Sequence, residues 1–120
     1  MGELVHPSHE EFVLSVSRQM SELVHAAAEG KILSLVAVRE ILWRLNSLKE
    51  IERDPDMLFP VGIDSESDSF PLGQERQYWA ADSLRERDEA ANRYESKVRD
   101  KVISSLERLA AKLAKLRAES

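Results

Sequence analysis

The stretch SLVAVREILWRLNSLKEI, residues 34–51, decides the fold of this chain. Its apolar positions recur at intervals of three and four residues and are Leu35, Val38, Ile41, Leu42, Leu45 and Leu48. This spacing places them on one face of an α-helix. Ser34 stands where a helix N-cap is expected. The stretch therefore predicts an amphipathic helix over 34–51 that buries one face.

A second amphipathic helix is predicted just before it, over residues 8–29. Ser8 and Glu11 have the spacing of a capping box, and apolar residues follow at helical intervals from Phe12 to Ala27. Gly30 can end this helix because glycine adopts the left-handed backbone conformation without a steric penalty. The link that remains is short, so we expect the two helices to pack as an antiparallel hairpin.

A long third helix is predicted over residues 82–117, which contain neither Gly nor Pro. Its last apolar residues follow a 3–4–3 spacing that resembles a coiled-coil seam and are Leu106, Leu109, Leu113 and Leu116. This helix would be roughly 50 Å long, against about 25 Å for the helix over 34–51. We therefore expect either a bend near Ser104-Ser105 or pairing of its end with a second copy.

Between these helices, residues 52–81 lose the helical pattern because prolines and glycines interrupt them. Apolar side chains are nevertheless scattered through the segment, so we expect an ordered loop with a short strand at Val61–Ile63. The predicted fold is a single all-α domain over residues 1–120. It consists of an antiparallel helical hairpin and a long third helix, with a long ordered acidic loop between helices two and three.

The net charge of −5 is unevenly distributed along the chain, since residues 50–89 carry −8 and residues 90–120 carry +4. An acidic chain with its cations at one end is a poor candidate for binding nucleic acid. No apolar run approaches the roughly 20 residues that span a bilayer. The first residues lack the basic region and apolar stretch of a signal peptide, so we expect a cytoplasmic protein.

The acidic loop has some of the spacing of a calcium site. Asp64, Glu66, Asp68 and Glu75 stand at positions 1, 3, 5 and 12 of an EF-hand loop, but Ser69 replaces the glycine of position 6. We favour instead an acidic loop displayed to a protein partner. Three histidines raise a second metal hypothesis, but they are spread along one helix and cannot converge: His6, His9 and His25.

Catalytic signatures are missing from the sequence, which contains no Cys, no Gly-x-Ser-x-Gly and no Gly-rich phosphate loop. We therefore expect neither an enzyme nor a cofactor. Trp43 lies beside the predicted core face and leaves two readings open. It could pack at the edge of the core, or it could be an exposed anchor for a protein partner, because Trp is enriched in interface hot spots.

The segment from Val61 to Trp79 reads VGIDSE-x-D-x-x-P-x-G-x-x-R-x-x-W. It resembles small uncharacterised bacterial helical proteins that carry a similar core between helices. The order of two helices, an acidic middle and a further helix also resembles, more loosely, Tsi6-like immunity proteins. That second resemblance implies a cytoplasmic protein that neutralises a cognate interbacterial toxin by binding it.

The expected function is a non-enzymatic protein-binding module, most specifically an immunity protein or antitoxin whose acidic surface occludes a toxin's active site. Toxins that act on nucleic acids usually present a positive cleft, which an acidic loop can fill. The expected contact residues are Asp64, Glu66, Asp68, Phe70, Glu75 and Trp79. The alternative is a structural homodimer or adaptor whose seam is Leu106, Leu109, Leu113 and Leu116. A calcium-binding regulator is a third possibility.

Overall fold

A computed structural model of the chain describes residues 9–46 and 48–119, and the side chains of all of these except 50 and 116–119. The fold is all-α, as predicted, and the described residues contain no strand. In chain order the elements are α1 (His9–Ala28), α2 (Ser34–Leu45), α3 (Lys49–Glu52), the 3-10 helix η1 (Pro55–Met57), α4 (Leu58–Glu66), the 3-10 helix η2 (Gln74–Tyr78) and α5 (Ala81–Glu119).

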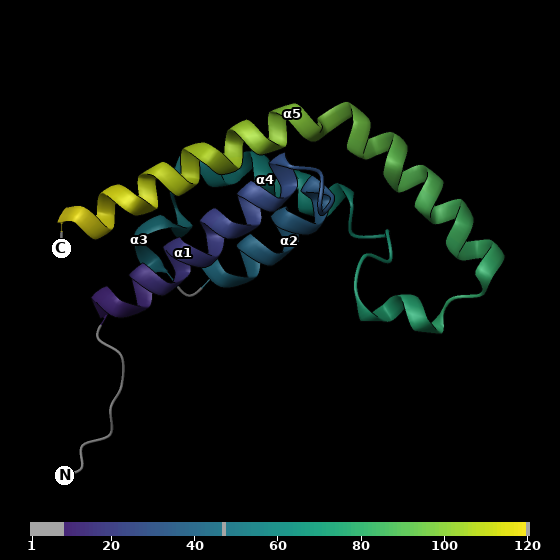
Figure 1. The fold of residues 1–120 in the computed structure, drawn as a ribbon, viewed down its shortest axis with the longest axis horizontal. Helices are drawn as coiled ribbons and strands as arrows, with labels where there is room; N and C mark the ends of the chain where they lie inside the picture. The colour runs from purple at the N-terminus through teal and green to yellow at the C-terminus, as the bar shows by residue number, and fades with distance from the viewer. Residues whose placement is uncertain (1–8, 47, 120) are drawn as a thin grey trace, which may run out of the picture.

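The predicted hairpin is confirmed, because α1 and α2 pack against each other and both contact α5 (Figure 1). Gly30 ends α1 with a φ of 78°, the left-handed conformation that glycine adopts most readily. The N–H of Lys31 donates to the carbonyl of Ala26 at 2.9 Å, which closes the last turn. The predicted cap residue Ser8 lies outside the described residues.

The helix predicted over 34–51 is two helices, because α2 ends at Leu45 and α3 begins at Lys49. Leu48 between them has an extended backbone, with φ −105° and ψ 101°. The side chains of Leu48 and Ile51 are both buried after this change of direction. The apolar residues are therefore buried on both sides of a helix break that their spacing did not predict.

The segment predicted as a loop, residues 52–81, contains the helix α4, and the strand predicted at Val61–Ile63 is wrong. Pro60 is the third residue of α4, inside the first turn, where a missing N–H leaves no helical hydrogen bond unmade. Pro60 and Ile63 are buried on one face of α4, which packs against α2 and α5. A proline at this position is therefore compatible with the helix.

The long helix α5 is continuous and curves over the hairpin (Figure 1). Leu106, Leu109 and Leu113 are each at most 1% exposed, because they pack into the chain's own core. The predicted self-association seam is therefore corrected: these three leucines are covered by the rest of the chain, and no second copy is needed to cover them. The side chain of the fourth, Leu116, lies outside the described residues.

Two residues of α5 hold the linked ends of the hairpin. The carboxylate of Glu95, which is 6% exposed, accepts hydrogen bonds from the Ser34 N–H at 2.8 Å, the Ser34 hydroxyl at 2.9 Å and the Leu35 N–H at 3.1 Å. One turn later, Arg99 donates to the carbonyl of Ala27 at 2.7 Å and to that of Ala28 at 3.1 Å. A negative group therefore lies at the start of α2 and a positive group at the end of α1, each complementing the helix dipole.

Replacing Glu95 by Ala should lower the free energy of unfolding by about 3 kcal/mol, because buried N–H and hydroxyl donors would lose their acceptor. Urea denaturation followed by circular dichroism measures this loss. Glu89→Ala on the same helix is the control, since Glu89 is exposed and its replacement should change stability by no more than about 0.5 kcal/mol. Equal stability of the two variants would contradict the capping role.

Leu109→Ala should cost about 2–5 kcal/mol of stability, because it creates a cavity in the core. Its oligomeric state, measured by light scattering, should equal that of the unmodified chain. Leu58→Ala is the matched control, since the Leu58 side chain is 76% exposed. A change of assembly state in Leu109→Ala without loss of stability would restore the seam hypothesis.

Candidate functional site

The first part of the acidic segment is turned inward by Arg39 of α2. The Arg39 guanidinium lies 3.6 Å from a carboxylate oxygen of Asp64 and 3.6 Å from one of Glu75. It also donates to the backbone carbonyls of Ser67, at 3.0 Å, and Phe70, at 3.5 Å. Two of the acids predicted to face a partner therefore form ion pairs with an arginine of their own chain.

Glu66 and Phe70 both contact Tyr94 of α5. The Tyr94 hydroxyl donates to the Glu66 carboxylate at 2.5 Å. The Phe70 ring is buried; its centroid lies 6.1 Å from the centroid of the Tyr94 ring and 5.1 Å from the guanidinium carbon of Arg87. The prediction that Phe70 is an anchor for a partner is therefore wrong, because this ring is buried in the chain's own core against side chains of α5.

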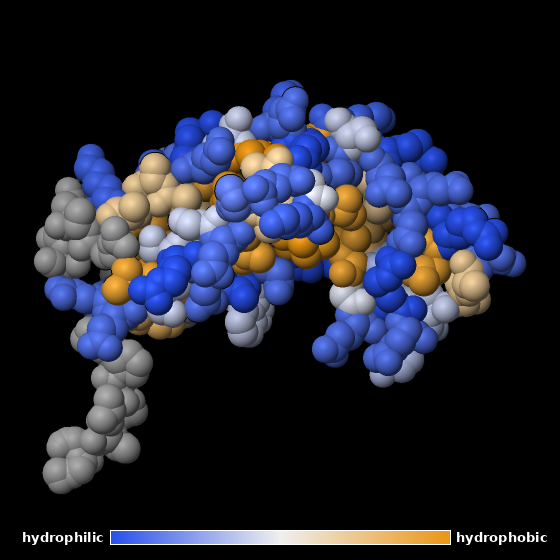
Figure 2. All heavy atoms as spheres, viewed as in Figure 1, coloured by the Kyte–Doolittle hydropathy of each residue, from blue (hydrophilic) through white to orange (hydrophobic). Residues whose placement is uncertain are grey.

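From Ser67 onward the chain forms a projection that we call the arm. The arm comprises residues 67–89, which include η2 and the first turns of α5. Figure 1 shows the arm extending away from α1 and α2, and Figure 2 shows a hollow that separates it from the helical bundle. Arg76 holds it together by donating to both carboxylate oxygens of Asp88, at 2.7 and 2.9 Å, and to the Pro71 carbonyl at 3.0 Å. Arg87 adds a bond to the Ser69 hydroxyl at 2.5 Å.

Arg76 and Asp88, which form the ion pair within the arm, shift each other's pKa in opposite directions. The hydrogen bonds from Arg76 lower the pKa of the Asp88 carboxyl below its usual value, and the same contact raises the pKa of Arg76. Both groups are therefore charged across the physiological range. The arm thus has a defined shape although it buries few apolar groups.

The arm exposes aromatic and acidic groups together. The Tyr78 side chain is 83% exposed and that of Trp79 is 39% exposed. Asp68, Glu86 and Glu89 are exposed, and within residues 9–46 and 48–119 their carboxylates have no hydrogen-bond or ion-pair partner. Residues 67–89 carry six acidic and three basic groups, a net charge of −3. Of the residues predicted to meet a partner, Asp68, Phe70, Glu75 and Trp79 lie within the arm, and Phe70 is buried there.

The basic end of α5 neutralises another part of the acidic middle segment. Lys112 lies 2.7 Å from Asp54 and 2.7 Å from Asp56. The hydrogen bond from Lys112 is the largest of the effects that lower the pKa of Asp54. The middle segment therefore has its acids at 54 and 56 paired, whereas Asp68, Glu86 and Glu89 on the arm stay unpaired within the described residues.

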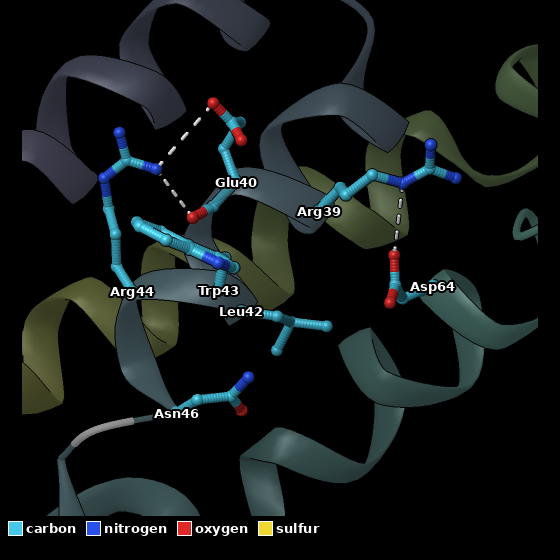
Figure 3. Close-up of a pocket in the computed structure, with 7 residues that line it drawn as sticks. All are labelled: Arg39, Glu40, Leu42, Trp43, Arg44, Asn46 and Asp64. Atoms are coloured by element: carbon cyan, nitrogen blue, oxygen red, sulfur yellow. Dashed lines mark hydrogen bonds and ion pairs between the residues drawn. The ribbon is translucent and has the colours of Figure 1, made fainter. Parts of the chain in front are cut away.

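A second candidate surface surrounds Trp43 on α2, whose indole is 73% exposed. A hollow of about 450 Å³ lies on its α4 side, and Figure 3 shows Arg39 and Asp64 at the far edge of this hollow from Arg44 and Glu40. A second hollow of about 490 Å³ lies between α1 and α2, lined by Phe12, Ser15, Val16, Gln19, Trp43, Arg44 and Asn46. The sequence left open whether Trp43 packs at the edge of the core or is exposed. In the structure its side chain is exposed.

The metal hypotheses gain no geometric basis among the described residues. Asp64 and Glu66 lie on the helix α4, and Glu75 pairs with Arg39. No group of three His, Asp or Glu side chains in the described ranges is close enough to hold one ion. His25 pairs with Glu29, at 3.1 Å, and His6 lies outside the described residues.

Comparison of the chain with protein-family models, with curated proteins and with solved structures finds no match. None of the helices in the described part of the chain combines the length and the hydropathy that a membrane crossing needs.

Glu66→Gln should lower the pKa of Tyr94, which burial first and the Glu66 carboxylate second raise from 10.0 to about 12. The pKa should remain above 10, because burial persists. The unmodified contact stabilises the fold below pH 10, and this contribution is lost as the pH rises from about 10 to about 12. Ultraviolet titration in a Tyr78→Phe background isolates Tyr94, since the chain has two tyrosines. An unchanged pKa would show that Glu66 faces solvent.

Proposed function

We propose that this chain is a non-enzymatic protein-binding module, most specifically a cytoplasmic immunity protein or antitoxin that neutralises a cognate bacterial toxin. The observation that carries the proposal is the arm, which presents Tyr78 beside exposed acids on a projecting segment. Tyr and Trp are enriched among the residues that contribute most to protein–protein binding. The net charge of −3 on residues 67–89 gives the arm a field that attracts a basic partner.

The arm acts by entering a positively charged cleft and blocking access to it. Toxins that act on nucleic acids or nucleotides need such a cleft to bind phosphate groups. Asp68, Glu86 and Glu89 attract the cleft at long range and raise the rate of association. Tyr78 then supplies the apolar contact that slows dissociation.

The ion pairs within the arm support the same proposal. Arg76 fixes Asp88 and the Pro71 carbonyl, and Arg87 fixes Ser69. A segment that is already ordered loses less conformational entropy when it binds. The contact surface therefore differs from the one predicted from the sequence, because Asp64, Glu66 and Phe70 support the arm from within and do not contact the partner.

The reading frame beside the gene for this chain supplies the partner to test. Expression of its product in a bacterial host should arrest growth, and co-expression of this chain should restore growth. Glu86→Lys with Glu89→Lys should slow association with the purified product at least about tenfold at low salt, because steering by the acids is reversed. Surface plasmon resonance measures the rate, and circular dichroism should remain helical.

The matched control is Glu22→Lys with Glu107→Lys, which changes the net charge by the same amount at exposed positions outside the arm. This control should leave association within about twofold, because its charges lie away from the contact. Equal slowing by both double variants would contradict the role of the arm. A neighbouring product that is harmless and does not bind would contradict the immunity function.

A further inference from the structure

The short helix α4 leaves apolar side chains exposed next to cations of α5. Leu58, Phe59 and Val61 are 76%, 38% and 49% exposed, although α4 has only nine residues. Phe59 borders a hollow of about 430 Å³ where α4 packs along the middle of α5 (Figure 1), and this hollow is also lined by Asp100, Lys101, Ser104 and Arg108. We propose that this hollow, the α4–α5 hollow, binds an acidic peptide segment of a partner protein.

The cations of the α4–α5 hollow are available to a ligand. Lys97, Lys101 and Arg108 are separated by intervals of four and seven residues, which places all three on one face of α5. Lys97 and Lys101 are exposed, and in the described part of the chain neither has a hydrogen-bond or ion-pair partner. Arg108 lies 4.0 Å from Asp56, whose carboxylate is already 2.7 Å from Lys112. The hollow therefore presents positive charge that its own chain compensates only weakly.

The lining of the hollow supplies both kinds of contact that such a segment needs. Lys101, Ser104 and Arg108 are hydrogen-bond donors, and a carboxylate is the acceptor that forms the strongest bonds with the two cations. Phe59 supplies apolar surface, and its burial under a Leu or aromatic side chain is favourable. An uncharged apolar ligand would remove water from Lys101 and Arg108 without replacing it, which costs free energy. The hollow therefore selects a carboxylate that stands beside an apolar side chain.

A short peptide suits the hollow better than an anionic bilayer or a nucleic acid. Asp100 lines the hollow beside Lys101, and Glu107 is exposed next to Arg108. An extended surface of phosphates would be brought against these two carboxylates, and the chain as a whole carries a net charge of −5. A peptide brings one carboxylate to the two cations, and its backbone N–H groups can donate to Asp100. The mixed charges of the hollow therefore favour a peptide.

Selection of random short peptides displayed on phage, with the intact chain as bait, tests the proposal without a known partner. The enriched set should include peptides that combine Asp or Glu with Leu or an aromatic residue. The most enriched of these acidic peptides is then synthesised, and fluorescence anisotropy measures its affinity for the chain and for variants of the hollow.

Lys101→Glu with Arg108→Glu should weaken binding of this acidic peptide at least about tenfold, because two charge-assisted hydrogen bonds are lost. Lys101→Gln with Arg108→Gln should act in the same direction, and circular dichroism should show that both double variants remain helical. The matched control is Arg18→Glu with Lys49→Glu, which changes the net charge equally at exposed positions on α1 and α3. It should leave the affinity within about twofold.

The hollow and the arm are tested separately. Asp100 lies eleven residues beyond Glu89, the last residue of the arm, which is roughly 16 Å along a helix and exceeds the screening length of about 8 Å at physiological salt. Glu86→Lys with Glu89→Lys should therefore leave binding of the acidic peptide within about twofold, whereas it slows association with the toxin. The charge reversal at Lys101 and Arg108 should have the opposite pattern.

An enriched set without acidic peptides overturns the proposal. An acidic peptide that binds the hollow variant and the control variant equally well overturns it too. Sedimentation with phosphatidylserine vesicles separates the remaining alternative: if the unmodified chain binds the vesicles, Lys101→Glu with Arg108→Glu does not, and no acidic peptide is enriched, the hollow contacts a membrane surface and the peptide proposal is rejected.

Discussion

The contact on which the rest of the structure depends is the pair of caps that α5 supplies to the hairpin. Glu95 accepts from the first backbone groups of α2, and Arg99 donates to the last carbonyls of α1. The two side chains also lie 3.6 Å apart as an ion pair on consecutive turns. Because both ends of the hairpin are held at one place on α5, the register of the long helix is fixed. The leucines beyond this point then meet α1 and α2, and the residues before it project as the base of the arm.

Several of the acids that make the middle of the chain negative form ion pairs within the chain. Arg39 and Lys112 each bridge two acids of the middle segment. Of the acids in the middle segment, Asp68, Glu86 and Glu89 on the arm are exposed and have no partner among the described residues. The molecule therefore has exposed surfaces of different chemistry, among them an acidic one with Tyr78 and a neutral one with Trp43.

Much of the fold follows from local spacing in the sequence. The periodic apolar residues of 8–29 and 34–51 predicted the hairpin, and the absence of Gly and Pro predicted the long last helix. The helix α4 was missed because Pro60 and Gly62 are usual signs of a loop, and the effect of a proline depends on which turn of a helix it occupies. The spacing of Leu106, Leu109 and Leu113 identified a buried face, but spacing does not specify whether the covering helix belongs to the same chain.

The candidate site was predictable only in part, for a related reason. The composition of residues 52–81 identified an acidic segment, and Asp68 and Trp79 lie on its exposed part, whereas Glu75 pairs with Arg39 of the same chain. The inward position of Asp64 depends on Arg39, 25 residues away along the chain, and the caps join Glu95 to Ser34 across 61 residues. Long-range pairs of this kind leave no periodic signal in one sequence. Exposure of Trp43 likewise depends on what the neighbouring helices leave uncovered.

The continuity of α5 has a consequence for how the molecule moves. Its residues from 81 to 90 include no buried side chain, whereas Val102, Leu106 and Leu109 are almost completely buried in the same helix. Local opening requires less free energy where few apolar contacts must be broken. Backbone amides should therefore exchange with solvent much faster at the start of α5 than near its middle. One uninterrupted helix thus has two different local stabilities.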